Sequence, residues 1–294
     1  MKLHSILAPV DFSEQSRLAL RWAAAFAARF SARLTIVSVV DPVLAEAARI
    51  RTGRDVLRTE TEAALREFAA ATWGDRGPDQ TAFGTAVGDA ASTILELAAA
   101  HDAGLIVMGT QGLGGFSKWL LGSTTERVLR KTGVPVLAVP LTDESHPPAV
   151  AADRISAVVA ATDFSDASVE GMKVAARLAR EFGAAMTAVH VVVPLAVPAQ
   201  WQTLVDNAAQ VRVDSARTRL RALAQVMCAE HPCEDVVALG RPAEAIAAIA
   251  GDRHAQLIVM GLGSARGSLA AAPGSIAYRV LRISPIPVLV VPGA

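Results

Sequence analysis

A glycine-rich segment carries the residues best suited to chemistry in this 294-residue chain. The stretch "GTQGLGGFSKWLLGST", residues 109–124, follows the apolar run "LIVM" and contains five glycines. It leads into an expected helix, so Gly122, Ser123 and Thr124 lie at a helix N-terminus, where free N–H groups and the helix dipole attract anions. Glycine also permits positive φ and lets the backbone approach a phosphate closely. The segment therefore has the outline of a phosphate-binding loop.

A structural interpretation of the same segment stays open beside this one. The run "STTE", Ser123–Glu126, matches a capping box, in which Ser123 caps the helix and the glycines form a mobile lid. Other nucleotide motifs fit poorly. A Walker loop needs Gly-Lys-Ser/Thr in succession, but Lys118 stands five residues before Ser123. A Rossmann fingerprint belongs after the first strand, where the chain reads "APVDFS" without a glycine.

No cluster of catalytic groups accompanies the loop, so the sequence predicts no catalytic residue and no protein-held metal. His4 and His101 belong to a strand start and a helix end, away from the loop. Cys228 and Cys233 lie close together with His231 between them, but a zinc site needs four ligands and a disulfide is not expected in a reducing cytosol. The two thiols are interpreted as structural or incidental.

Composition narrows the class of protein. Just over half of the residues are apolar and the formal net charge is zero, which favours a globular fold and argues against nucleic-acid and membrane partners. The first residues leave no room for a secretory apolar region, and the longest apolar run is broken by His190 and Pro194. We therefore expect a soluble, cytoplasmic protein.

The elements that must position the loop occur twice. At a shift of 152 residues, "APVDFSEQSRLALRW" lies over "AATDFSDASVEGMKV", and "LIVMGTQGLGG" lies over "LIVMGLGSARG". Short apolar runs alternate with longer amphipathic ones in each copy, the pattern of a parallel sheet covered by helices. We expect two tandem doubly wound α/β domains, each with five strands, over residues 1–141 and 154–294, joined by a Pro-containing and charged linker at 142–153.

Expected elements of the first copy follow the same periodicity. The expected strands are 5–10, 33–40, 80–86, 104–108 and 135–139, and the expected helices are 14–29, 43–71 with a break at Gly53, 90–101 and 124–131. The loop at Gly109 then leaves the end of the fourth strand, at the edge of the sheet where ligands of open α/β folds bind.

The spacing of Gly109, Gly112, Gly122 and Ser123 resembles the G-x2-G-x9-G-[ST] nucleotide motif of the universal stress protein family. The runs "PVDFS", "IVSVVDP" and "GVPVLAVP", repeated as "AATDFS", "AVHVVVP" and "PIPVLVVP", are also similar to that family. The resemblance covers nearly the whole chain twice, and implies a tandem member of the ATP-binding branch with a Rossmann-like fold similar to that of adenine nucleotide alpha hydrolases.

Carried over residue by residue, the resemblance assigns Asp11 to the ribose or adenosine and the backbone of Val39 to adenine. It assigns phosphate binding to Gly109, Gly112, Gly122 and Ser123, with a further hydroxyl from Thr124. Mg²⁺ is expected to be held through the phosphates. A turn or capping role for Asp11, and burial in the core for Val39, remain alternatives.

The second copy retains the outline of this site with a weaker motif. Its matching residues are Asp163, Val191, Gly261, Gly274 and Ser275. Ser264 replaces Gly112, Pro273 replaces Leu121, Ile276 replaces Thr124 and Ala270 replaces Lys118. These changes add a Cβ, remove an N–H and remove a hydroxyl and a positive charge, so we expect weaker binding in the second copy.

The expected function is an ATP-binding regulatory protein of the stress response, in which nucleotide occupancy is the signal. A slow ATPase or nucleotide-dependent phosphotransferase, and an ATP-independent scaffold with vestigial sites, are the alternatives. The resemblance also implies that "PVLAVP" and "PVLVVP" pair edge to edge within the chain, and it leaves a homodimer open. The sequence does not indicate the protein partner or the inducing stress.

Overall fold

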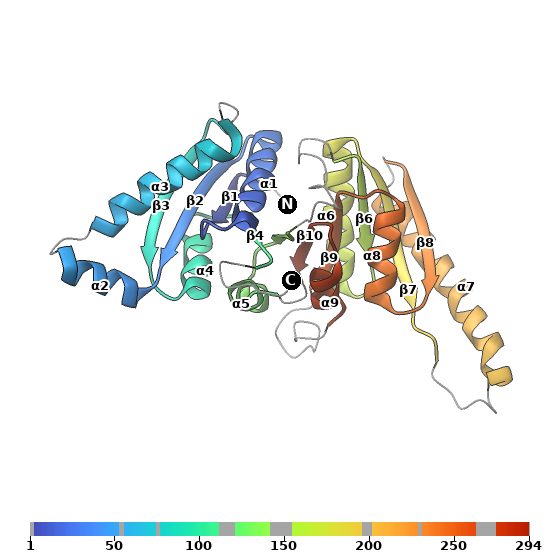
Figure 1. Cartoon of the computed structure of the whole chain (residues 1–294). Helices are drawn as coiled ribbons and strands as arrows, with labels where there is room; N and C mark the ends of the chain where they lie inside the picture. Colours follow the sequence, from blue (N-terminus) through green and yellow to red (C-terminus); the bar gives the residue numbers. More distant parts are fainter. Residues whose placement is uncertain are drawn as a thin grey trace. The chain divides into compact units, whose positions relative to one another are not determined.

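The computed structural model of the chain describes residues 3–52, 56–74, 77–111, 121–141, 155–195, 202–228, 231–262 and 275–293 (Figure 1). The chain divides into two compact units, Met1–Asp153 and Arg154–Ala294, which are called the first and the second domain below. The linker expected at 142–153 lies outside the described residues. Each domain is described by itself.

The sheet of the first domain consists of parallel strands in the order β3-β2-β1-β4-β5. The strands are β1 (Ser5–Pro9), β2 (Arg33–Val40), β3 (Thr81–Val87), β4 (Leu105–Gly109) and β5 (Val136–Val139). Leu105, Ile106 and Val107 are fully buried, because helices cover both faces of the sheet. Strands of this kind appear in the sequence as continuous apolar runs.

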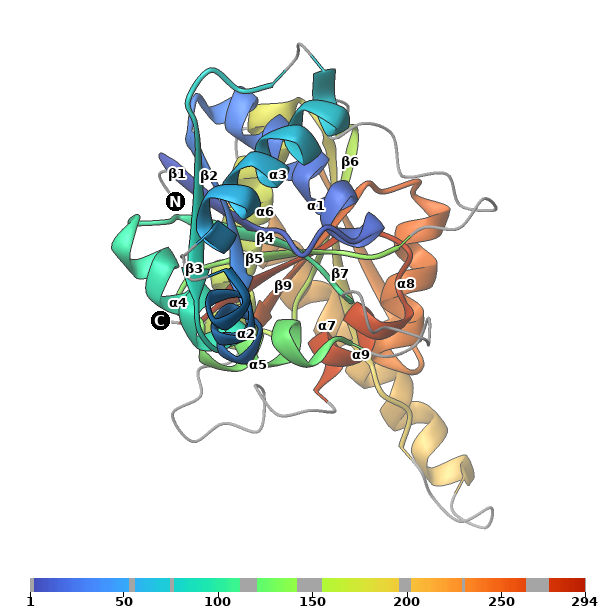
Figure 2. The same cartoon turned by 60° about the vertical axis from the view of Figure 1, so that its left-hand side comes forward.

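Helices α1 (Glu14–Phe30) and α3 (Val56–Trp73) pack together on one face of this sheet (Figure 2). Helices α4 (Ala90–Ala100) and α5 (Ser123–Lys131) pack together on the other face, and α2 (Pro42–Thr52) precedes α3. The chain therefore leaves β1 toward one face and leaves β4, its neighbour, toward the other face. The point where the strand order reverses lies between these two strands.

Helix α1 shows why these segments are helical. Ser13 caps its first turn by accepting a hydrogen bond from the Ser16 N–H. Its buried face carries Leu18, Trp22 and Phe26 at helical spacing. Ser31 ends the helix in the left-handed conformation, with its N–H bonded to the last carbonyls.

The second domain repeats this topology, with parallel strands in the order β10-β9-β6-β7-β8. Its strands are β6 (Ala157–Ala161), β7 (Ala185–Val192), β8 (Cys233–Leu239), β9 (Leu257–Leu262) and β10 (Val288–Pro292). Its helices are α6 (Asp166–Phe182), α7 (Gln202–Met227), α8 (Pro242–Asp252) and α9 (Ile276–Ile283). Figure 1 shows the end of α7 away from β8 projecting from the sheet of its own domain.

The predicted fold class, tandem doubly wound α/β domains with parallel sheets, is confirmed. The expected helix at 43–71 is divided into α2 and α3, and residues 53–55 between them lie outside the described residues. The described part of the chain contains no helix long and apolar enough to span a bilayer. Edge-to-edge pairing of "PVLAVP" with "PVLVVP" stays a prediction.

Candidate functional site

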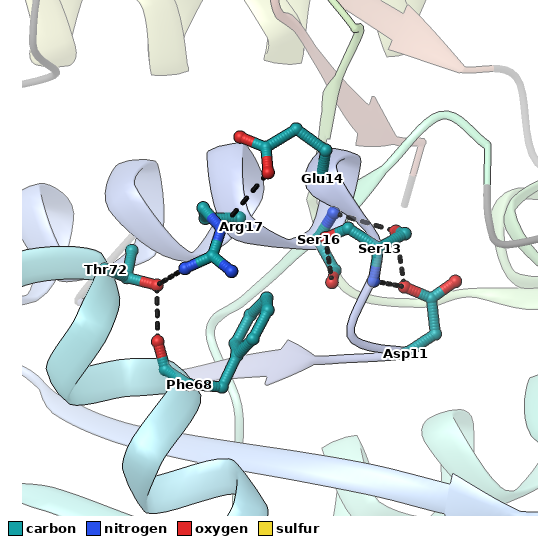
Figure 3. A network of polar contacts seen from close by, with 7 residues as sticks. All are labelled: Asp11, Ser13, Glu14, Ser16, Arg17, Phe68 and Thr72. Atoms are coloured by element: carbon teal, nitrogen blue, oxygen red, sulfur yellow. Dashed lines mark hydrogen bonds and ion pairs between the residues drawn. The ribbon is translucent and has the colours of Figure 1, made fainter.

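The turn between β1 and α1 is built around the carboxylate of Asp11 (Figure 3). Asp11 Oδ1 accepts hydrogen bonds from the Ser13 N–H at 3.1 Å and from the Ser13 hydroxyl at 2.5 Å. The Ser13 hydroxyl oxygen in turn accepts from the Ser16 N–H at 3.2 Å, which caps α1. The turn role that the sequence left open for Asp11 is therefore present, and its role toward a ligand stays a prediction.

An aromatic contact holds this turn in a strained conformation. Phe12 has a φ of 64°, which is uncommon for a residue other than glycine. Its ring packs edge-on against the ring of Phe68 in α3, with centroids 5.5 Å apart. The Arg17 guanidinium lies 4.3 Å over the Phe68 ring and donates to Thr72 Oγ1 at 3.4 Å (Figure 3). The turn that carries Asp11 is thus packed against α3 through Phe12 and Arg17.

The second domain repeats the turn with its own support. Asp163 Oδ1 accepts from the Ser165 N–H at 2.9 Å and from the Ser165 hydroxyl at 2.5 Å. Burial alone would raise the pKa of Asp163, but hydrogen bonds from Ser165, Ser168 and its own backbone together outweigh burial and lower that pKa. Phe164 has a φ of 66° and packs against the ring of His190, with centroids 4.4 Å apart.

Val39 lies where β2 extends past the end of β1. The backbone bonds between these strands end, in the described part of the chain, with the Val10 N–H donating to the Val37 C=O at 2.8 Å. Alternate residues of a strand direct their N–H and C=O to the same neighbour, so those of Val39 point past the end of β1. The side chain of Val39 is only half-buried, and so is that of Val191 at the end of β7.

Two hydrogen bonds join the end of β4 to the start of α5. The Gly122 N–H donates to the Thr110 C=O at 2.7 Å, and the Thr125 hydroxyl donates to the Gly109 C=O at 2.8 Å. These bonds fix both ends of the glycine-rich segment. Gly112 and Gly274 lie outside the described residues. Sequence reasoning missed Thr110 and Thr125, because neither belongs to the spacing motif.

Neighbouring atoms lie close to the three motif glycines that the structure describes, Gly109, Gly122 and Gly261. A Cβ on Gly109 would lie 2.8 Å from Gln15 Cβ in the first turn of α1, and a Cβ on Gly261 would overlap the backbone of Ala167, the matching residue of α6. A Cβ on Gly122 would lie 3.2 Å from the Thr110 oxygen. Gly122 has a φ of −62°, so it does not use the positive φ that glycine permits. Its N–H is also engaged by Thr110 rather than left for a ligand.

Helix α5 begins without a side-chain cap. Gly122 is the N-cap residue and provides no side-chain hydrogen bond, while Ser123 is the first helical residue and is exposed. The capping-box alternative for Ser123 is therefore wrong, because the helix begins one residue earlier than that motif requires. The first helical bond joins the Glu126 N–H to the Gly122 C=O, so the N–H groups of Ser123, Thr124 and Thr125 lie ahead of the helical ladder.

The corresponding start of α9 differs in two ways. Ser275 is the N-cap residue, and its hydroxyl oxygen is buried without a hydrogen-bond partner in the described structure. Ala277 stands where Thr125 stands in the first domain, so the tether between helix and strand is missing. The helix that should hold the second site is thus attached differently to its sheet.

An ion pair beside the first site has no counterpart in the second domain. Arg127 of α5 donates from both Nη atoms to the two oxygens of Asp89, the N-cap residue of α4, at 2.7 Å each. These bonds, followed by those that Asp89 accepts from the Ser92 N–H and hydroxyl, hold the pKa of Asp89 well below its usual range. Arg241 and Arg279 stand at the matching positions, so two positive charges replace the pair. The two residues of this pair stand 38 positions apart, so no local sequence pattern indicates it.

The carboxyl ends of the adjacent strands β1, β2 and β4 lie at the same edge of the sheet, and they bring together Asp11, Val39 and Gly109. The profile of the universal stress protein family matches residues 2–140 and again residues 155–292. The chain belongs to the universal stress protein family. The tandem arrangement predicted from the internal repeat is thereby confirmed.

Full-length relatives share the tandem organisation. A universal stress protein of Mycobacterium tuberculosis is 26% identical over 308 residues, which cover 98% of this chain and 97% of the relative. The crystal structure of a universal stress protein from Archaeoglobus fulgidus aligns over 100% of both chains, with a TM-score of 0.69 and 21% identity. A further solved universal stress protein, 26% identical over 48% of this chain with a TM-score of 0.36, is in complex with cAMP.

Proposed function

We propose that this universal stress protein is an ATP-binding regulatory protein, and that ATP occupies the first domain, with nucleotide occupancy as the regulatory signal. The observation that carries the proposal is the pair of open backbone edges at the carboxyl end of the first sheet. Val39 directs its N–H and C=O past the end of β1, and α5 begins without a side-chain cap. By contrast, α1 and α4 in the same domain are capped by Ser13 and Asp89.

The groups at this edge match the chemistry of an adenine nucleotide. A strand-end N–H and C=O can pair with the edge of adenine, and a carboxylate such as that of Asp11 accepts from sugar hydroxyls. The N–H groups of Ser123, Thr124 and Thr125 and the positive end of the α5 dipole suit a phosphate. Mg²⁺, when present, would be held by phosphate oxygens and water.

A proline at the first helical position provides the most selective test. Proline is tolerated there because the helix does not use that N–H, and Gly122 already has the extended conformation that a following proline requires. Ser123→Pro should therefore keep the fold and remove one phosphate donor and a hydroxyl. We expect ATP affinity, measured by calorimetry, to fall by about tenfold to a hundredfold.

Ala90→Pro is the matched control. Ala90 is the first residue of α4, and Asp89 before it also has an extended conformation, with φ −69° and ψ 122°. The control variant should bind ATP as the wild type does. Equal affinity of Ser123→Pro and wild-type protein, or no ATP binding by the wild type, would contradict the proposal and favour a scaffold with vestigial sites.

The slow ATPase or phosphotransferase is the alternative activity. In the described structure no group of three or more His, Cys, Asp or Glu side chains is placed to hold a metal ion. ATP turnover by the wild type with a KM for ATP that rises in Ser123→Pro, in parallel with the loss of affinity, would establish this alternative. Turnover with an unchanged KM in the variant would identify a contaminant.

A further inference from the structure

The two cysteines of the chain lie together at the junction of α7 and β8. Cys228 follows the last residue of α7, and Cys233 is the first residue of β8. The His231 N–H donates to the Cys228 C=O at 3.0 Å, which closes a turn and brings the chain back toward the end of the helix. Residues 229–230 lie outside the described residues.

Both cysteines are neighbours of Met186 of β7. Met186 is the direct neighbour of Cys233 in the parallel register between β7 and β8. The Cys228 Sγ lies 3.6 Å from the Met186 Sδ, across the end of α7. Met186 is buried at 2% exposure, whereas each cysteine is partly exposed. The structure thus places two thiols side by side over a buried apolar floor, within reach of a small oxidant.

The two sulfurs have unequal character. A hydrogen bond from the Cys233 thiol lowers the pKa of Cys228, against a smaller opposing effect of burial. The same hydrogen bond, burial and the negative charges of Cys228 and Asp235 raise the pKa of Cys233. The shared hydrogen bond therefore favours ionisation of the Cys228 thiol over that of Cys233. This is the arrangement of a sensing cysteine beside a resolving one.

We propose that Cys228 and Cys233 form an oxidation site for hydroperoxides, which closes to a reversible disulfide between the end of α7 and the start of β8. The Cys228 thiolate attacks a peroxide oxygen; an S–O bond forms, the O–O bond breaks, and hydroxide leaves. Cys233 then attacks the sulfenic sulfur; the S–S bond forms and the S–O bond breaks. The hydroxide released from the sulfenic acid takes the proton of the Cys233 thiol and leaves as water. Two thiols and one hydrogen peroxide give one disulfide and two waters.

This site belongs to the second domain alone, since the chain has no other cysteine. It does not depend on the proposed nucleotide site, because β7, β8 and α7 carry no residue of the first domain. The proposal also revises the interpretation of the two thiols as incidental. A disulfide that forms only on exposure to peroxide is compatible with a reducing compartment, in which it is later reduced.

Intact-mass spectrometry of the reduced full chain after one equivalent of hydrogen peroxide tests the proposal. We expect the loss of two hydrogens, about 2 Da, with both thiols becoming unreactive toward a thiol reagent and reappearing after dithiothreitol. Because the chain has two cysteines, the mass change is unambiguous. Gain of oxygen without loss of hydrogen, disulfide-linked dimers, or two unreacted thiols would each overturn the proposal.

Single variants separate the roles of the two sulfurs. Cys233→Ser should stop at a sulfenic acid on Cys228, which dimedone traps. Cys228→Ser should react more slowly than Cys233→Ser, because burial and the charge of Asp235 still raise the pKa of Cys233 when Cys228 is absent. Met186→Leu removes the third sulfur and should still form the disulfide. Equal rates in the two cysteine variants would contradict the assigned roles.

Discussion

The tether between the glycine-rich segment and its sheet is present in the first domain and absent from the second. In the first domain Thr125 donates to the Gly109 C=O, and Arg127 on the next turn pairs with Asp89. In the second domain the matching residues are Ala277, Gly261, Arg279 and Arg241, which can form neither interaction. The β1–α1 turn, by contrast, is retained in both copies, with Asp11 and Asp163 in the same hydrogen-bonded arrangement.

This difference shows that the turn and the loop are under separate constraints. The turn starts the first helix of each domain, so folding alone requires it. The tether and the ion pair position α5, whose first turn has no side-chain cap. Loss of both in the second domain agrees with the sequence changes at Ser264, Pro273 and Ile276, and supports the inference that the two sites are not equivalent.

The largest expected effect concerns the first glycine of each copy. Gly261→Ala should lower the free energy of unfolding by about 3 kcal/mol, because the new Cβ overlaps the backbone of α6. Gly109→Ala should cost less, about 1–2 kcal/mol, since its shortest contact, 2.8 Å to Gln15 Cβ, is longer than the contact of Gly261 with the Ala167 oxygen. Urea unfolding of the full chain measures both. Gly251→Ala, in open space within α8, is the control and should not destabilise. A smaller loss for Gly261→Ala than for Gly109→Ala would contradict this packing.

A moderate effect is expected for the tether. Thr125→Val keeps the shape of the side chain and leaves the buried Gly109 C=O without its donor, so we expect a loss of about 1–2 kcal/mol in the free energy of unfolding. Thr124→Val, one residue earlier and half-buried, should change stability by less than about 0.5 kcal/mol. Equal effects of the two substitutions in urea unfolding would show that the bond from Thr125 contributes nothing.

The smallest effect concerns the exposed ion pair. Because the folded-state pKa of Asp89 lies below the ordinary value of 3.8, the pair stabilises the first domain above about pH 4 and loses this effect as the pH falls further. Asp89→Asn should remove that part of the acid dependence of the urea midpoint. Arg241→Asp should slightly raise the midpoint at neutral pH by pairing with Arg279. An unchanged acid dependence in Asp89→Asn would rule out a contribution from the pair.

The fold was largely predictable from the sequence, for a physical reason. Strands buried on both faces must be apolar throughout, so β2 was predicted at its observed bounds, Arg33–Val40, and β1 and β4 within one residue at each end. The repeat then predicted the second domain. Helix ends were predicted less closely where no glycine or proline stops the helix. Helix α1 was predicted to end at residue 29 and extends to Phe30.

The site was only partly predictable, because glycine has several uses that spacing cannot separate. The motif identified Gly109 and Gly122. The atoms that crowd a side chain at these positions belong to Gln15 and Thr110, which contact the glycines only in the folded chain. Ser123 was compatible with capping until the helix start was known. The bond from Thr125 and the pair of Asp89 with Arg127 join residues distant in sequence, so no local pattern could indicate them.

Calorimetric titration of ATP into two matched proline variants tests the inequality of the domains most directly. Ser123 and Ile276 are the first residues of α5 and α9, and each follows an N-cap residue in the extended conformation, so proline should be tolerated at both. The account predicts one high-affinity ATP site per chain, weakened about tenfold to a hundredfold by Ser123→Pro and unaffected by Ile276→Pro. Loss of high-affinity binding in Ile276→Pro, with full binding retained in Ser123→Pro, would contradict it.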